Sequence, residues 1–131
     1  MKKLKKKIEL IIEVTKDGYS AYSNDTPICT MGKDLDDLMK NAIEVTELYY
    51  DNRFEISTDN FIFSMNLKQF FDYFKVLNSK QIAQRVGINP SLLSQYINGK
   101  KKPSNIQTKK ILSGVHQLAH ELTQISRFAA G

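Results

Sequence analysis

The sequence predicts an α+β fold in two parts: a small antiparallel sheet with one helix over residues 1–65, and an all-α domain over residues 66–131. Three observations predict it. Apolar residues recur at every second position near the start of the chain, which is typical of half-buried strands. An acid-capped helical pattern follows this region. From residue 66 onward the apolar residues have helical spacing, and capping residues mark the start of each helix.

The first two strands form a predicted hairpin. Large apolar residues recur at alternate positions of the opening strand: Ile8, Leu10, Ile12 and Val14. This alternation is typical of a strand with one buried face. Asp17-Gly18 is a strong hairpin-turn signal, and residues 19–23 then return as the second strand.

Shorter strands are expected further along the chain. Residues 27–31 supply a third strand that Gly32 ends, and the alternating aromatic residues of 61–65 form a last strand. Residues 54–57 fit either a further strand or an extended lead-in, and the sequence leaves both open. The expected product is a small antiparallel sheet with one helix on one face.

That helix is expected to begin after Asp34, an N-cap residue. Asp36 and Asp37 occupy its first turn, where the positive end of the helix dipole favours acids. Asp51-Asn52 ends it. Its predicted apolar stripe consists of Leu35, Leu38, Ala42, Val45 and Tyr49.

A second helix is expected after Asn66, in the carboxy-terminal half. Its apolar side is Leu67, Phe70, Phe71, Phe74 and Leu77. This spacing favours core packing, and a stacking platform for nucleic-acid bases is the alternative.

Residues 78–104 form two predicted short helices, a tight turn and a run of cations. Asn78 caps the first helix, and Gly87 follows it where a left-handed residue is common. Asn89 caps the second helix, with Pro90 at its first position. This is the layout of a helix-turn-helix DNA reader. The plain alternative is a helical hairpin with a solvated basic loop.

Polar residues on the outer side of the second of these helices are candidates for DNA contacts. Four are expected to approach base edges: Ser91, Ser94, Gln95 and Asn98. The candidates for phosphate contacts are Ser79, Lys100, Lys101 and Lys102. Asn89, at the helix start, completes the predicted DNA-binding set.

The last helix is expected to begin after Ser104, with Gln107 in the capping-box position. Its apolar residues step by four, three, four and three: Ile111, Val115, Leu118, Leu122 and Ile125. This stripe covers the helix-turn-helix core, forms a dimer, or does both. Gly114 either weakens the helix or permits close packing. A homodimer or higher oligomer is expected, because such readers dock two recognition helices about 34 Å apart.

Charge is divided between the two halves. Residues 8–66 hold four cations and twelve acids, a net charge of −8, whereas residues 67–131 hold ten cations and two acids, a net charge of +8. The basic half suits double-stranded DNA, and the acidic half suits a cationic partner or simply water. The five lysines of residues 1–7 either contact nucleic acid or protect an edge strand from aggregation, and the second role is preferred.

Several other classes of protein are not expected. The lone Cys29 has no internal disulfide partner and fits a reducing compartment. Glu9 and Glu13 interrupt the apolar segment that a signal peptide needs. No run is long enough to span a membrane, so a cytoplasmic location is predicted.

No catalytic, metal or cofactor site is expected. His116 and His120 are four residues apart, but no third ligand is spaced nearby. The chain has no glycine-rich phosphate loop. The acids at residues 34–37 are mostly used at a helix start, which argues against a metal-dependent nuclease.

The first half also resembles a known family. Residues 16–50 read KDGYSAYSNDTPICTMGKDLDDLMKNAIEVTELYY, and their order of features is similar to that of HicB-type antitoxins. The resemblance implies a partial ribonuclease-H-like fold that masks a small basic RNA-cleaving toxin. It also implies a carboxy-terminal phage-repressor-like (XRE-type) helix-turn-helix domain that represses the operon for both proteins.

An acidic cover would favour such a cationic toxin. The residues assigned to it are Asp34, Asp36, Asp37 and Glu44. Helix capping and a solvated face are the alternative roles of these acids. The alternative function is a repressor whose first half senses a small molecule or another protein, and an unusual nuclease is a more distant class.

Overall fold

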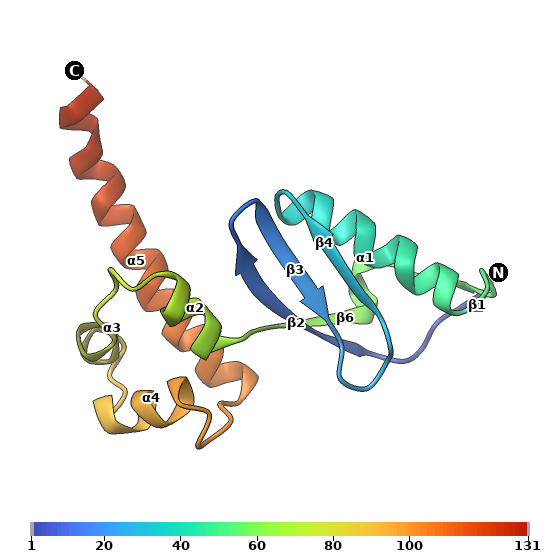
Figure 1. The fold of residues 1–131 in the computed structure, drawn as a ribbon, viewed down its shortest axis with the longest axis horizontal. Helices are drawn as coiled ribbons and strands as arrows, with labels where there is room; N and C mark the ends of the chain where they lie inside the picture. The colour runs from blue at the N-terminus through green and yellow to red at the C-terminus, as the bar shows by residue number, and fades with distance from the viewer. Residues whose placement is uncertain (1, 131) are drawn as a thin grey trace. The chain divides into compact units, whose positions relative to one another are not determined.

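The computed structural model describes residues 2–130, which divide into two compact units at Phe70–Phe71. The first unit is a sheet with a helix, and the second consists of helices (Figure 1). The predicted α+β fold is confirmed. None of the helices in the described residues combines the length and the apolar character needed to span a membrane.

The elements follow the predicted order closely. Those up to Met65 are β1 (Lys2–Lys3), β2 (Ile8–Thr15), β3 (Gly18–Tyr22), β4 (Cys29–Gly32), α1 (Leu35–Tyr49), β5 (Phe54–Glu55), the 3₁₀ helix η1 (Thr58–Asn60) and β6 (Phe61–Met65). The helices that follow are α2 (Leu67–Tyr73), α3 (Ser79–Val86), α4 (Pro90–Ile97) and α5 (Asn105–Ala130).

The main sheet has the strand order β4-β3-β2-β6 and is mixed. β3 is antiparallel to both of its neighbours, but β2 and β6 are parallel, with Ile8 opposite Phe61. The expectation of an antiparallel sheet is therefore wrong for this pair. The reason is that α1 lies between β4 and β6 in the chain, and a helical crossover returns the next strand in the same direction.

The β2–β3 hairpin turns one residue earlier than predicted. Thr15 pairs with Gly18, so Lys16 and Asp17 occupy the two loop positions. Gly18 is already the first residue of β3.

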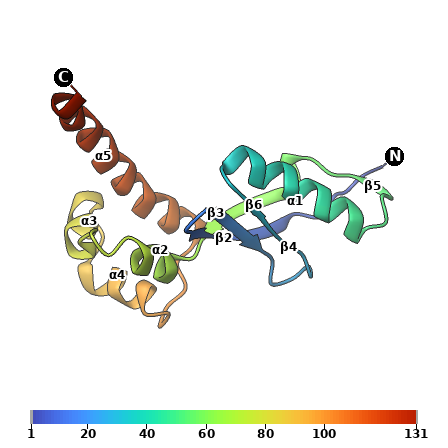
Figure 2. The same ribbon diagram turned by 45° about the horizontal axis from the view of Figure 1, so that its top comes forward.

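The core of the first unit lies between the sheet and α1, which covers one sheet face (Figures 1 and 2). The buried side of α1 is Leu38, Ala42 and Thr46, whereas Leu35 is 59% exposed and Tyr49 43% exposed. The predicted stripe is therefore wrong at both ends. Thr46 can be buried in the core because its hydroxyl donates a hydrogen bond to the Ala42 carbonyl oxygen at 2.7 Å.

The lysine-rich amino terminus is tied to the segment after α1. Lys2 and Lys3 of β1 pair in parallel with Phe54 and Glu55, which settles the open question for residues 54–57: two of them form β5. Asn60 then donates its side-chain amide to the carbonyl oxygens of Leu4 (2.7 Å) and Lys6 (3.1 Å).

The start of α2 belongs to the first unit. The Asn66 amide donates to the Ile12 carbonyl oxygen at 3.1 Å. The Gln69 side chain bonds to both backbone groups of Val14, at 2.9 and 2.6 Å. These bonds explain why the unit boundary falls inside α2, whereas the sequence placed it before residue 66.

The second unit packs α3 against both α4 and α5. Its most deeply buried residues are Ile82, Ala83, Leu93 and Ile111. Gly114 of α5 permits a close approach to α3, because a Cβ atom there would lie 2.5 Å from Val86 Cγ1. Close packing is therefore the role of this glycine.

Candidate nucleic-acid and partner interfaces

The position of α4 is fixed at its start by local bonds. The Asn89 side-chain oxygen accepts from the Ser91 amide at 2.8 Å, and Pro90 is the first helical residue. Leu93 is 1% exposed and anchors the inner side of the helix. Asn89, predicted to bind DNA, thus has its side-chain oxygen occupied by the helix start.

The turn between α3 and α4 has the geometry that the sequence predicts. Gly87 ends α3 with φ of 72°, in the left-handed region that glycine adopts without a Cβ penalty. Ile88 follows and is buried, and its amide donates to the Ala83 carbonyl oxygen at 2.9 Å. A three-residue turn thus connects two helices of eight residues each.

The predicted base-reading residues share one face of α4. Ser91, Ser94 and Asn98 are exposed and Gln95 is half-buried. Their spacing of three or four residues makes them neighbours on the helix surface. The Asn98 side-chain amide donates to the Ser94 hydroxyl at 3.4 Å, so two of the four are already linked.

The lysine loop is held against the end of α4. The amides of Lys100 and Lys101 both donate to the Gln95 carbonyl oxygen, at 2.9 and 3.3 Å. All three lysines of this loop, residues 100–102, are exposed. The backbone of the loop is therefore held at the end of α4, the helix that carries the predicted base-reading residues.

The other predicted phosphate contact lies at a helix start, and two exposed cations that sequence reasoning left out lie in the second turn of α5. Ser79 is the first residue of α3, directly after the cap Asn78, whose side-chain oxygen accepts from the Gln81 amide at 3.1 Å. Lys109 and Lys110 are exposed in the early turns of α5. Their position after the lysine loop in the sequence was the available signal.

Two of the four predicted toxin-binding acids are engaged at the start of α1. The Asp34 carboxylate accepts from the Asp37 amide at 2.8 Å, and the Asp37 carboxylate accepts from the Lys33 amide at 3.0 Å. Asp36 and Glu44 are exposed instead. Lys40 lies four residues from each of them, so the exposed stripe alternates in charge.

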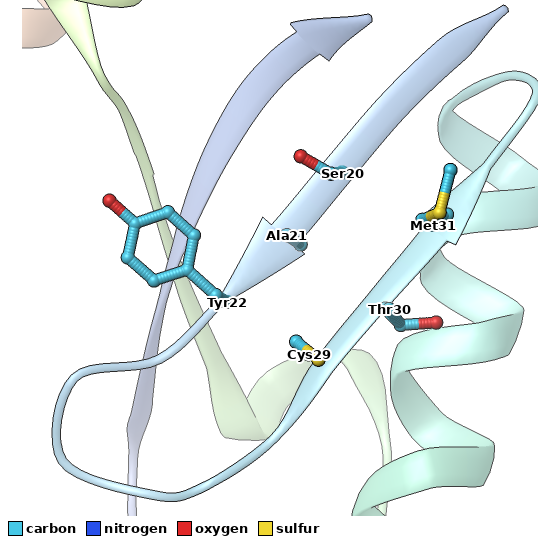
Figure 3. Close-up of a pocket in the computed structure, with 6 residues that line it drawn as sticks. All are labelled: Ser20, Ala21, Tyr22, Cys29, Thr30 and Met31. Atoms are coloured by element: carbon cyan, nitrogen blue, oxygen red, sulfur yellow. The ribbon is translucent and has the colours of Figure 1, made fainter.

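The first unit also has two apolar hollows. A cavity of about 220 Å³ lies between α1 and the sheet, lined by Leu10, Ile12, Leu35, Leu38, Met39, Ala42 and Phe63. A more open hollow of about 500 Å³ lies over β3 and β4, lined by the six residues that Figure 3 shows. Met31 is 63% exposed beside it. Both hollows suit apolar contacts rather than acid–base chemistry.

An ion pair connects α3 and α5. The Arg85 guanidinium donates to both carboxylate oxygens of Glu121, at 2.5 and 3.1 Å. This hydrogen bonding lowers the pKa of Glu121 below its ordinary value and raises the pKa of Arg85. The bidentate pair links α3 and α5 on their exposed side.

The residues that could serve as metal ligands or nucleophiles are exposed and belong to different units. His116 and His120 are exposed on α5, and Cys29 is an exposed residue of the edge strand β4. Within residues 2–130, no three His, Cys, Asp or Glu side chains come together as a metal site would require.

Comparison with known proteins identifies no relative of this chain. No protein-family model matches the chain, and no curated protein or solved structure matches it. Support for a function therefore comes from the geometry of α3 to α5, from the charge distribution and from the sequence resemblance.

Proposed function

We propose that this chain is an antitoxin and autoregulatory repressor: its second unit binds operator DNA, and its first unit binds and masks a small basic RNA-cleaving toxin. The observation that carries the DNA-binding part is the polar face of α4 with the lysine loop attached to its end. The toxin-binding part rests on the resemblance to HicB-type antitoxins and on the acidic residues 8–66.

In this proposal α4 is the recognition helix in the major groove. The Gln95 side-chain amide can form two hydrogen bonds with one adenine, donating to N7 and accepting from N6. Ser91, Ser94 and Asn98 contact neighbouring base edges. The cations of residues 100–102 and the α3 start at Ser79 hold the flanking phosphates and set the register. Contacts to base edges thus provide specificity, whereas contacts to the DNA phosphates position the protein.

The toxin-binding role is assigned to the α1 side of the first unit. Asp36 and Glu44 are the exposed acids of the predicted cover, and both are free of the capping task that occupies Asp34 and Asp37. A basic RNA-binding protein would meet electrostatic complementarity there. Apolar contact area is available beside Asp36, since Leu35, the first residue of α1, is 59% exposed.

Two substitutions test the DNA-binding roles. Gln95→Ala should cost about 1–3 kcal/mol on the preferred operator and relax specificity at one base pair. Lys101→Ala should weaken binding to all sequences alike and reduce the salt-dependence slope by about 1. Binding is measured by fluorescence anisotropy over a salt series, with Lys40→Ala of α1 as the control for a lost exposed cation. Identical behaviour of the Gln95 and Lys101 variants would show that the roles are wrongly assigned.

The toxin-binding role is tested by co-expression. The chain is produced with the product of an adjacent reading frame for a short basic protein. We expect relief of growth arrest and co-purification of the two proteins. If the two products never associate, the antitoxin role is wrong. The DNA-binding role is then decided by the operator measurements alone.

The apolar cavity of about 220 Å³ favours a second candidate, a repressor that senses a small apolar molecule. Apolar pockets are the usual sites for such ligands. This candidate predicts that a probe such as indole raises the melting temperature and alters operator affinity, and that Ala42→Phe abolishes both effects. A nuclease has less support, because Asp34 and Asp37 bond to backbone amides; metal-dependent RNA cleavage by the pure chain would favour it.

A further inference from the structure

We propose that one end of the first unit binds single-stranded nucleic acid, with lysines of residues 2–7 on the phosphates and Tyr49 stacked on a base. The site combines residues 2–7 with residues 47–60, which run from the last turn of α1 through β5 to η1. We call these two segments together the β1 end. The site lies outside the second unit and does not rest on the proposed function.

The lysines of residues 2–7 do not protect an edge of the main sheet. β2, the strand that follows them, lies between β3 and β6 in the strand order. β1 pairs with β5 alone, and each of these strands is two residues long. Because so short a strand offers little edge for another chain to pair with, protection from aggregation does not account for a run of five lysines.

The backbone of the lysine segment is held by the fold. Leu4 packs against the core of the unit, and its amide donates to the Glu55 carbonyl oxygen at 3.3 Å. The Asn60 side chain bonds to the next carbonyl oxygens, those of Leu4 and Lys6. β1 lies beside the last turns of α1 (Figure 1). A ligand therefore meets lysines whose backbone is already ordered, which lowers the entropic cost of binding.

Three of the five lysines are available to a ligand. Lys6 donates to the Thr26 hydroxyl at 3.2 Å, and Lys7 donates to the Asp59 carbonyl oxygen. The other three are exposed, and their ammonium groups have no hydrogen-bond or ion-pair partner among residues 2–130. These three are Lys2, Lys3 and Lys5. Ammonium groups of this kind are suitable partners for a phosphate backbone.

Arg53 adds a further cation to the same place. It directly precedes Phe54, whose backbone pairs with that of Lys2, and neighbouring strands lie about 4.8 Å apart. The Arg53 Nε donates to the Tyr50 carbonyl oxygen at 3.1 Å, and the side chain is exposed. The guanidinium is therefore held beside the strand pair with its other nitrogens open to a ligand.

The β1 end is positive within an acidic unit. It holds six cations and four acids, a net charge of +2. The acids are Glu47, Asp51, Glu55 and Asp59. The rest of the first unit, residues 8–46 and 61–70, holds four cations and eight acids, a net charge of −4. A polyanion is therefore attracted to this end of the unit and repelled by the remainder.

An aromatic cluster adjoins these cations. Tyr49, Tyr50 and Phe54 form a chain of edge-to-face contacts, with ring centroids 4.9 and 5.5 Å apart. Tyr50 and Phe54 are half-buried, whereas Tyr49 is 43% exposed. The two inner rings thus support the outer one. An exposed ring beside a row of cations is the combination on which single-stranded nucleic acids bind, through base stacking and phosphate contacts.

The exposed ring favours a single strand over other polyanions. The bases of a duplex are stacked on one another, so their faces do not meet a protein ring, whereas unpaired bases do. An anionic membrane needs an inserted apolar anchor as well as cations. Leu4 packs against the core, and Leu48, which is 67% exposed, is a weak anchor by itself.

Fluorescence anisotropy with a labelled oligouridine of about twelve nucleotides tests the phosphate contacts on the full chain. The second unit also attracts polyanions, so every measurement is made in a chain with glutamine at residues 100–102. In this background, glutamine at Lys2, Lys3 and Lys5 should weaken binding at least about tenfold and reduce the salt slope by about 2, since each contact to a single strand contributes about 0.7. The matched control places glutamine at three exposed lysines elsewhere in the unit and should change both values far less. These are Lys16, Lys33 and Lys40.

The stacking role is tested at Tyr49. Tyr49→Ala should weaken binding at least about fivefold and leave the salt slope unchanged, because base stacking involves no counterion release. Tyr49→Phe should bind like the background chain. Leu48→Ala, which removes an exposed apolar neighbour, is the matched control and should have no effect. Circular dichroism and the melting temperature check that each variant is folded.

Four results would overturn the proposal. They are no oligouridine binding by the background chain up to about 100 μM, equal effects of the two lysine triples, a Tyr49→Ala chain that binds like Leu48→Ala, and dependence on Leu48 and the β1 lysines only for vesicles that contain phosphatidylserine. A parallel titration with oligothymidine identifies the source of the strand: RNA alone implies contact with the 2′-hydroxyl, and equal binding implies that either strand serves.

Operator titrations with the same lysine variants separate this site from the proposed function. Glutamine at Lys2, Lys3 and Lys5 should leave operator affinity unchanged in a chain with the natural residues at 100–102. Loss of operator affinity without loss of oligouridine binding would place the segment on the duplex and overturn the single-strand site. A chain that binds oligouridine through the β1 end but no operator would refute the repressor and leave this site intact.

Discussion

Gly114 determines how closely α5 approaches α3. Any side chain at this position meets Val86, because a Cβ atom would lie 2.5 Å from Val86 Cγ1. Val86 is β-branched and has few rotamers available within a helix. The space for a larger residue must therefore come from a shift of one helix, and both helices are anchored in the same core by Ile82 and Ile111.

Gly114→Ala should destabilise the chain by about 1 kcal/mol. The overpacking cost of about 1–3 kcal/mol exceeds the gain of about 1 kcal/mol in helix propensity. Urea unfolding followed by circular dichroism measures the change. In a Val86→Ala background the clash is gone, so the same substitution should become neutral or stabilising. An unchanged sign in that background would show that Val86 is not the obstacle.

Residue-scale features were the most predictable part of the structure. Asp34, Asn78, Asn89 and Ser104 each accept a hydrogen bond from a backbone amide two or three residues ahead, as their sequence positions indicate. Such caps depend on a few neighbouring residues only, so a single sequence contains the necessary information.

At the scale of elements, the Arg85–Glu121 pair links two helices that are far apart in the chain. The two residues are separated by 36 positions, and both side chains are partly exposed. No spacing or pattern in the sequence relates these two residues, so the sequence alone did not indicate the pair. Its geometry nevertheless gives it a measurable pH dependence.

The Glu121 carboxyl should titrate below the usual range of a glutamate, because hydrogen bonding from Arg85 lowers its pKa. A carboxylate with a lowered folded-state pKa stabilises the fold above its unfolded pKa, and this contribution is lost as the pH falls through the folded value. Carboxyl carbon chemical shifts follow the titration. Arg85→Gln should move the midpoint upward, whereas Arg127→Gln, on the same helix, should leave it in place. Equal shifts in the two variants would indicate a general charge effect.

Elements that depend on distant partners were less predictable. The parallel β2–β6 pair joins residues more than fifty positions apart, and no local pattern distinguishes it from an antiparallel pair. On α1, Thr46 joins the buried side of the helix although it is polar, because its hydroxyl bonds to Ala42 within the same helix. The polar face of α4 was predictable because its register follows from Asn89 and Pro90. The exposed end of α5 was not, since the repeat looks the same whether or not α3 covers it.

On the scale of the whole molecule, acids are concentrated in residues 8–66 and cations in residues 67–131, apart from the five lysines of residues 1–7. The acids that give residues 8–66 their net charge of −8 lie in the first unit, and nine of the ten cations of residues 67–131 lie beyond Phe70. Two ligands of unlike charge would therefore address different units. Their binding should be separable by substitution.

Replacing Asp36 by Asn and Glu44 by Gln in one chain should slow association with a basic partner about two- to fivefold and leave operator affinity unchanged. Rim charges act mainly on association rates, and their effect weakens as salt rises. Stopped-flow association with the co-purified partner and operator anisotropy provide the two readouts. Asp34 and Asp37 are left intact because they hold the start of α1.

The control removes the same amount of charge elsewhere in the first unit, through Asp17→Asn with Glu55→Gln; both residues are exposed. If Asp36 and Glu44 form a local cover, this control pair should change the rate far less. Equal slowing by both pairs would mean that the acids act only through the overall field of the unit, and the contact surface would then have to be sought at the apolar hollows instead.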